Sequence, residues 1–225
     1  MTVYPLGQLS TFGLCFIGAG AIITNALTNG AVGLLGIALA HGIVLAVLVS
    51  ALGHISGAHV NPAVTIGLLV GGKIKGGRAV GYIISQLIGG VIAGLLLRTI
   101  YSTEVWAKVN LGTPGLGPGI GAGTGVLVEI ILTFFLVLAV YGTAVDEKAP
   151  KIGGFGIGMV LVFDILMGGP LTGASMNPAR TFGPALVSGY WDAHWVYWVG
   201  PILGAILATV LYKLCTSGDS SESAG

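Results

Sequence analysis

One tripeptide occurs twice in this chain, as Asn61-Pro62-Ala63 and as Asn177-Pro178-Ala179. The residues before the two copies also match, because Ser56-Gly57-Ala58 precedes the first and Thr172-Gly173-Ala174 precedes the second. Each copy opens an apolar stretch of about ten residues, which as a helix reaches roughly 15 Å, half of a bilayer's hydrocarbon layer. The sequence therefore predicts two half-helices, one in each half of the chain.

The composition places most of the chain in lipid. Of its 225 residues, 54% are hydrophobic and 8% are charged, which is too little charge for a water-facing surface. Apolar stretches of about 20 residues, long enough to cross a bilayer, predict six membrane spans. These lie at residues 8 to 28, 33 to 53, 79 to 101, 124 to 144, 153 to 169 and 195 to 214.

The lysines and arginines predict an orientation. One predicted face carries Lys73, Lys75, Arg78, Lys148, Lys151 and Lys213, and the other carries Arg98, Lys108 and Arg180. Loops on the cytoplasmic side of membrane proteins are richer in Lys and Arg. The first face, and with it both chain termini, is therefore expected in the cytoplasm.

Each half of the chain holds three spans and one half-helix. Because three is an odd number of crossings, the second half is expected to run through the membrane inverted relative to the first. We expect a single domain over residues 1 to 225, with inverted repeats at about 1 to 110 and 111 to 216 and a disordered tail at 217 to 225. The two half-helices would then enter from opposite sides and meet end to end.

The repeated tripeptide has the chemistry of a helix start. Asn is a preferred N-cap, and Pro at the first helical position gives up only an amide that has no helical partner. The facing helix ends would bring two partial positive charges together at mid-membrane, where the Asn61 and Asn177 amides could donate to a passing water. Two plain helix starts are the alternative, and the matching flanks favour a pore.

The backbone just before each tripeptide is expected to be non-helical. Such backbone is tolerated at mid-membrane depth where it lines a cavity or is buried in protein. The residues expected to line a pore with their backbone are Gly57, Ala58, His59, Gly173, Ser175 and Met176.

Two segments carry a resemblance to a known family. His54 to Thr65 (HISGAHVNPAVT) and Gly173 to Ala185 (GASMNPARTFGPA) resemble the signatures of the aquaporin, or major intrinsic protein, family. The resemblance implies an all-α membrane protein with the hourglass fold, built from six transmembrane helices and two re-entrant half-helices. It also implies a homotetramer with one pore per subunit that conducts water or small neutral solutes passively. We expect an integral multi-pass protein of the plasma membrane, surrounded by lipid and binding no nucleic acid.

The resemblance also implies a filter near the outer mouth. By their spacing from the two Asn residues, Arg180 matches the family's filter arginine, and Ala174, Ile165 and His41 match the other three positions. This set resembles the filter of plant vacuolar (tonoplast) aquaporins. Ile165 should leave one wall wider and less polar than in a strict water channel, so ammonia is expected to pass along with water.

Two acidic residues fall within predicted spans and need partners there. Glu129 matches the family's buried glutamate that accepts hydrogen bonds from a re-entrant loop, so it is expected to support the second half-helix. Its counterpart in the first span falls near Gly7, where Gln8 is the nearest polar residue, and this departure puts the usual packing of the first span in question. For Asp164 we expect a buried hydrogen-bonding residue rather than a pore group.

Some positions distinguish water channels from glycerol channels of this family. Thr181, Ala185 and the pair Tyr197-Trp198 resemble water channels, whereas Gly169-Pro170-Leu171-Thr172-Gly173 resembles some glycerol facilitators. A glycerol- or urea-permeable facilitator therefore stays as an alternative to a water channel.

Other classes of protein fit the sequence less well. An enzyme would need a nucleophile with a base, or a metal cluster, and the four histidines and two cysteines lack such spacing, so we expect no metal, no cofactor and no catalysis. An ion-coupled transporter would carry acids along its path, whereas the only charge of the predicted pore is Arg180. A structural membrane protein on the same fold is a further alternative.

Overall fold

The structure is a computed structural model that describes residues 3–150, 152 and 154–217. Eight helices form its frame. They are α1 (Val3–Leu27), α2 (Gly33–Ser56), α3 (Pro62–Val70), α4 (Gly76–Ile100), α6 (Ala122–Val140), α7 (Phe155–Thr172), α8 (Pro178–Ser188) and α9 (Val196–Ser217). A short helix α5 (Thr103–Trp106) and a 3-10 segment (Ala107–Gly112) follow α4, and a π-helical turn (Tyr141–Val145) extends α6.

Six of these helices are long and apolar enough to cross a membrane, as the sequence predicts. Their mean hydropathy lies between 1.6 and 2.4 in the most apolar window of each. The predicted boundaries differ most at α1, which begins at Val3 rather than at residue 8. α7 runs on to Thr172, three residues beyond its predicted end, before Gly173 ends it with a φ of 77°. Pro170 stands in the last turn of α7, two residues before the helix ends.

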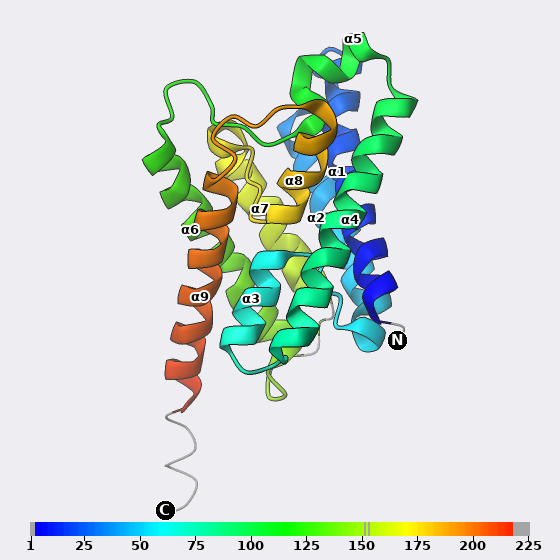
Figure 1. Cartoon of the computed structure of the whole chain (residues 1–225). Helices are drawn as coiled ribbons and strands as arrows, with labels where there is room; N and C mark the ends of the chain where they lie inside the picture. The colour runs from blue at the N-terminus through cyan, green and yellow to red at the C-terminus, as the bar shows by residue number, and fades with distance from the viewer. Residues whose placement is uncertain (1–2, 151, 153, 218–225) are drawn as a thin grey trace, which may run out of the picture.

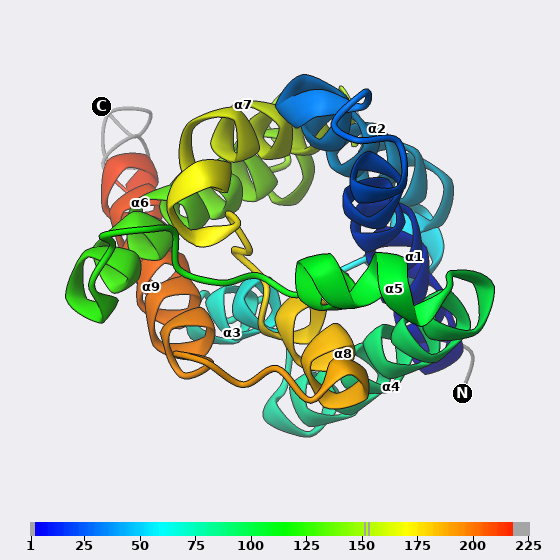
Figure 2. The same ribbon diagram turned by 90° about the horizontal axis from the view of Figure 1, so that it is seen from above.

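The six long helices surround the two short ones. Figure 2 shows α6, α7, α2, α1, α4 and α9 around α3 and α8, and Figure 1 shows α3 in the lower half of the molecule with α8 above it. Each half-helix packs against a long helix from the other half of the chain. A Cβ at Gly90 of α4 would lie 2.6 Å from the Ala179 carbonyl oxygen of α8, and Thr209 of α9 donates to the Gly67 carbonyl oxygen of α3.

Small residues let the long helices approach closely. In α4, Gly89 faces the Gln8 backbone of α1, and in α9, Gly204 faces the Ile130 backbone of α6, with no room for a side chain at either glycine. These glycines belong to rows of small residues spaced four apart in α4 (Gly81, Ser85, Gly89, Ala93) and α9 (Gly200, Gly204, Ala208). The rows therefore serve packing within the chain.

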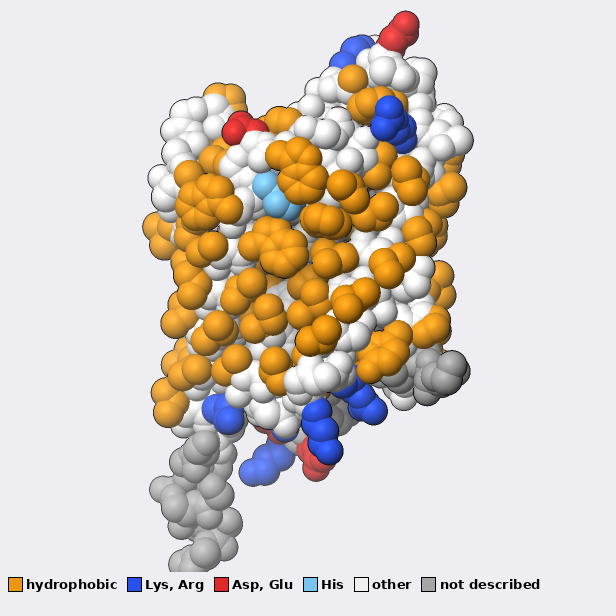
Figure 3. Space-filling model, in the orientation of Figure 1, with side chains coloured by type: hydrophobic (Ala, Val, Ile, Leu, Met, Phe, Trp, Pro, Cys, Tyr) orange, Lys and Arg blue, Asp and Glu red, His pale blue; other side chains and the backbone are white. Residues whose placement is uncertain are grey.

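The exposed charged side chains gather at the two ends of the described molecule (Figure 3), whereas Glu129, Asp164 and Arg180 are buried inside it. Figure 3 shows a broad hydrophobic band with Lys and Arg concentrated below it. α1 begins and α9 ends at this lower end, where the α3–α4 turn also lies with Lys73 and Lys75 (Figure 1). Lys151, which also counted toward the predicted orientation, lies outside the described residues. The predicted tail does as well, except for Ser217, which ends α9.

Candidate functional site

The two half-helices begin in the same way. Asn61 and Asn177 are extended residues, with φ values of −150° and −149°, and each is followed by a proline at the first helical position. The Asn61 side-chain oxygen accepts a hydrogen bond from Ala63 N at 2.8 Å, and that of Asn177 accepts from Ala179 N at 3.0 Å. Both tripeptides are thus capped helix starts, as their residue types predict.

The same two asparagines also join the halves of the chain. The Asn61 amide nitrogen donates to the Met176 carbonyl oxygen at 2.7 Å, and the Asn177 amide nitrogen donates to the Val60 carbonyl oxygen at 3.1 Å. Each amide nitrogen carries two hydrogens, and one is used in this way. The second hydrogen of each is available to a molecule in the cavity that both residues line.

The loops before the half-helices repeat one backbone course. Gly57 and Gly173 have φ values of 76° and 77°, and left-handed residues follow at Ala58 and Val60 in the first loop and at Ala174 and Met176 in the second. This conformation is costly for residues with a side chain and tends to persist where the surroundings enforce it, often at functional sites.

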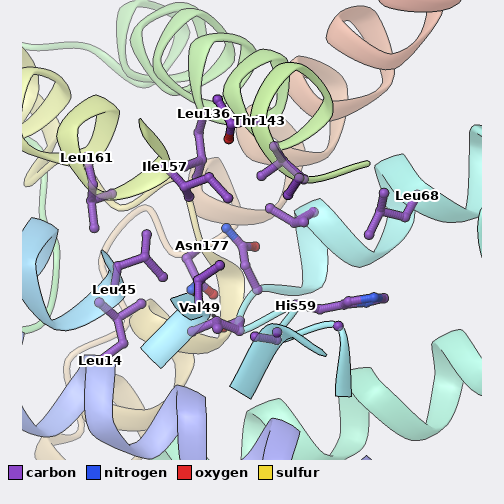
Figure 4. Close-up of a pocket in the computed structure, with 18 of the residues that line it drawn as sticks. Leu14, Leu45, Val49, His59, Leu68, Leu136, Thr143, Ile157, Leu161 and Asn177 are labelled. Atoms are coloured by element: carbon purple, nitrogen blue, oxygen red, sulfur yellow. Dashed lines mark hydrogen bonds between the residues drawn. The ribbon is translucent and has the colours of Figure 1, made fainter. Parts of the chain in front are cut away.

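A cavity of about 520 Å³ runs along these loops. Figure 4 shows Leu14, Leu45, Ile157 and Leu161 around it, with Asn177 among them. Its polar wall residues include Ser50, His54, His59, Asn61, Lys73, Thr143, Ser175, Asn177 and Arg180. The cavity wall is therefore mostly apolar, and the two loops and the asparagines add polar groups to it.

The sequence-predicted pore residues divide into two groups. The cavity wall includes Gly57, Ala58, His59 and Ser175, and also His41, Ala174 and Arg180 from the expected filter. Ile165, Gly173 and Met176 are not in the wall of this cavity as the described residues form it. The Met176 side chain is fully buried and its carbonyl oxygen is bonded to Asn61, while Gly173 packs against Pro114.

Arg180 and His41 are hydrogen-bonded to each other. The Arg180 guanidinium, 3% exposed, donates to His41 Nε2 at 3.3 Å and to the Gly112 carbonyl oxygen at 3.0 Å. His41 Nδ1 lies 2.9 Å from the Ile37 carbonyl oxygen. A carbonyl only accepts and a guanidinium only donates, so His41 is the tautomer with its proton on Nδ1. Both ring nitrogens of His41 are thus engaged by protein groups.

The Gly112 contact was not predicted from the sequence. It comes from the 3-10 segment after α5, where Asn110, Leu111 and Gly112 all have positive φ. A Cβ at Gly112 would lie 2.8 Å from the Ala19 Cβ, so only glycine lets this segment lie against α1 with its carbonyl toward Arg180. An Asn and a Gly two residues apart are typical of such turns, but they do not indicate what the turn contacts.

Glu129 holds the second loop. Its carboxylate is fully buried on α6 and accepts from Thr172 Oγ1 at 2.7 Å, Ser175 N at 2.9 Å and Met176 N at 2.7 Å. The structure therefore places this acid where it satisfies backbone donors that would otherwise be buried without partners.

The first loop is held without an acid. Thr11 of α1 donates to the Val60 carbonyl oxygen at 3.0 Å, and the Tyr82 hydroxyl of α4 donates to the Ser56 carbonyl oxygen. The His59 ring stacks on Tyr82, with ring centres 4.4 Å apart. Gln8 makes no side-chain hydrogen bond to the loop among the described residues, so Thr11 rather than Gln8 is the polar contact from α1.

Two further polar residues lie outside the cavity wall. Asp164 is 1% exposed on α7 and lies outside the cavity wall, as expected, but its Oδ2 has no hydrogen-bond partner within the described part of the chain. His194, in the loop before α9, accepts from the Trp198 ring nitrogen at 3.1 Å, and burial lowers the pKa of His194.

Comparisons with known proteins agree with this architecture. A family model described as "Major intrinsic protein" matches residues 7–212. Aquaporin TIP4-4 of Zea mays is 49% identical over 90% of this chain and 81% of its own, and probable aquaporin TIP3-2 of Arabidopsis thaliana is 45% identical over 91% and 80%. The structure of the aquaglyceroporin from Plasmodium falciparum superimposes with a TM-score of 0.81 at 24% identity, covering 93% of this chain and 94% of that one, which shows a shared fold.

Proposed function

The chain belongs to the major intrinsic protein, or aquaporin, family, and we propose that its cavity is a passive pore for water and small neutral solutes. The observation that carries this proposal is the reciprocal pair of bonds from Asn61 and Asn177, which brings two half-helix starts together at the wall of the cavity. Membership in this family of membrane channels also confirms that the chain is an integral multi-pass membrane protein and not an enzyme.

The mechanism follows from the donors at the centre. A water molecule beside Asn61 and Asn177 accepts from their free N–H groups, so its own hydrogens point outward, toward the two mouths of the pore. The partial positive charges of both helix starts favour the same orientation. A water held in this way cannot relay a proton along a continuous chain, and these charges together with Arg180 repel cations.

The filter is proposed to consist of His41, Ile165, Ala174 and Arg180. Because both ring nitrogens of His41 are occupied, polar contact with a solute at this level falls to the Arg180 guanidinium and backbone carbonyls. Ala174 lies in the cavity wall and Ile165 outside it, and we propose that the two together give the filter an apolar side. Such a side costs ammonia, which is hydrated more weakly than water, less than it costs water. We therefore propose ammonia as a second solute.

A glycerol- or urea-permeable facilitator is the second candidate. The segment from Gly169 to Gly173, which resembles some glycerol facilitators, favours it. The Tyr197 hydroxyl donates to the Thr172 carbonyl oxygen at 2.8 Å, which fixes the end of that segment behind the filter. A purely structural role is less well supported, because the cavity reaches from the inner loops to Arg180.

The finer points of organisation are also proposals. The matching backbone course of the two loops supports inverted repeats at about 1 to 110 and 111 to 216, and the basic end of the described molecule supports cytoplasmic termini. A homotetramer rests on the family alone. The TIP-type relatives do not support the plasma membrane expected from the sequence, and we propose a vacuolar membrane instead.

The test is transport by the purified protein in liposomes. Swelling followed by light scattering, in parallel for water, glycerol and urea, should show water passing fastest, and an internal pH dye should report ammonia entry faster than in empty vesicles. Proton conductance that rises with water flux would contradict the mechanism. The variant His41→Phe/Ile165→His should reduce ammonia entry more than water flux, and an unchanged ratio would remove the filter proposal.

A further inference from the structure

α1 contributes to the cavity wall at one level and leaves space at the next. Leu14 lines the cavity, and Gly18 stands four residues later, so the two share a face of the helix. At the level of Leu14 a side chain projects toward the cavity. One turn further along, the helix presents bare backbone.

The His41 ring of α2 occupies the space that Gly18 leaves. A Cβ at Gly18 would overlap His41 Nε2 and Cδ2 and would lie 2.9 Å from Cε1. His41 is 3% exposed, so its ring is enclosed by this contact on one side and by the neighbouring helices on others. Any side chain at position 18 therefore requires the ring to move.

The His41 ring cannot move far without breaking one of its hydrogen bonds. Its Nδ1 is bonded to the Ile37 carbonyl oxygen at 2.9 Å, and its Nε2 accepts from Arg180 at 3.3 Å. Because His41 and Arg180 both line the cavity, displacement of the ring from its place against Gly18 changes the cavity wall and the bond to Arg180.

We propose that Gly18 is a specificity-determining position of the pore. Because Gly18 has no side chain, the His41 ring packs directly against α1 with its Nε2 hydrogen-bonded to Arg180. Gly18 thereby sets the width of the filter, although it does not itself line the cavity. This inference rests on the proposed function, in which His41 and Arg180 bound the narrowest level. Gly18 is a positioning residue, since it acts through His41.

The experiment measures water permeability per channel of the full chain in liposomes. Gly18→Ala should lower it about tenfold, which corresponds to a barrier higher by about 1.4 kcal/mol. Gly20→Ala is the matched control, because a Cβ there would meet only Leu97 at an ordinary 3.4 Å, and it should conduct as the unchanged protein does. Equal permeability of Gly18→Ala and the unchanged protein would overturn the proposal.

Repeating the substitution in the His41→Ala variant separates the effect of a displaced His41 ring from a general loss of structure. In His41→Ala the obstructed ring is gone, so adding Gly18→Ala should have no further effect on water permeability. The same tenfold loss in both backgrounds would overturn the role of Gly18. If Gly18→Ala alone gives no folded protein, folded protein from the double variant His41→Ala/Gly18→Ala supports the contact between position 18 and the His41 ring, and failure of both variants to fold overturns the proposal. His41→Ala with unchanged urea and water passage would instead refute the filter itself.

Discussion

The loops of residues 57–61 and 173–177 follow the same backbone course but are held in place by different groups. In the second loop, the Glu129 carboxylate takes the backbone N–H groups of Ser175 and Met176. In the first loop, the Thr11 hydroxyl binds the Val60 carbonyl oxygen, and the His59 ring stacks on Tyr82. The difference lies in the group that contacts the loop itself: a carboxylate accepts from two backbone N–H groups of the second loop, and a neutral hydroxyl donates to one carbonyl oxygen of the first.

This difference shows which features the shared geometry depends on. Both loops have a glycine, two left-handed residues after it and a capping asparagine. At the end of the preceding helix, a tyrosine hydroxyl donates to a carbonyl oxygen in both cases: Tyr82 to that of Ser56, and Tyr197 to that of Thr172. The backbone course follows from these common parts. The supporting group from α1 or α6 is free to differ, and hydrogen bonds to a charged group are the stronger kind.

The largest effect is expected for Glu129→Gln. An amide cannot accept on both sides as the carboxylate does, so at least one buried N–H loses its partner, and stability should fall by about 2–3 kcal/mol. Thermal unfolding in detergent measures this. Glu104→Gln, at an exposed acid of α5, is the control and should leave the unfolding temperature unchanged. Altered selectivity with unaltered stability would reverse the assignment of Glu129 as a support.

The next effect concerns charge. Three residues after Asn61 the first half-helix has Val64, and three after Asn177 the second has Arg180, so Arg180→Val makes the two alike. The change removes a buried cation and widens the filter, and urea passage relative to water should rise about tenfold, or about 1.4 kcal/mol in barrier. Parallel swelling assays measure the ratio. Arg98→Val, at an arginine that binds the Val187 carbonyl oxygen outside the cavity, should not change it.

A smaller effect should be the same in both halves. Tyr82→Phe and Tyr197→Phe each remove one hydroxyl from a buried helix-end carbonyl, and each should cost about 1 kcal/mol of stability. The comparison of their unfolding temperatures tests whether these tyrosines are equivalent. A loss confined to one of them would show that the end of α2 and the end of α7 are not supported alike.

The smallest effect is expected for Thr11→Val. It removes the hydroxyl on the Val60 carbonyl oxygen while keeping the shape of the side chain, and we expect a loss of about 0.5–1 kcal/mol. Thr99→Val is the matched control, because its hydroxyl bonds only to its own helix at Leu95. A loss as large as that of Glu129→Gln would mean that the first loop depends on a single contact after all.

The fold could be predicted to a large extent from the sequence because its signals are local. Asn61 and Asn177 cap helices through their own side chains, and the six spans follow from the length of apolar runs. The prediction missed how α6 ends, since the π-helical turn from Tyr141 to Val145 continues an apolar helix with no distinctive residue pattern.

The details of the site were less predictable because they depend on contacts between distant segments. Nothing in the spacing indicates that Gly112 reaches Arg180, or that Thr11 takes the place expected for Gln8. Gly18 looks like any glycine of an apolar helix until the face it turns toward His41 is known.

The reciprocal bonds of Asn61 and Asn177 also bear on how the chain is made. The partner of the Asn61 amide is 115 residues further along, so at a synthesis rate of about 5–20 residues per second it does not exist for roughly 6 to 23 s after Asn61 is added. During that interval the first half-helix has neither its central bond nor the α9 surface on which it rests. Polar groups at a helix start are unstable in lipid without hydrogen-bond partners. The first loop therefore has to stay in contact with water or protein until the second half of the chain is made, and it inserts into the membrane only afterwards.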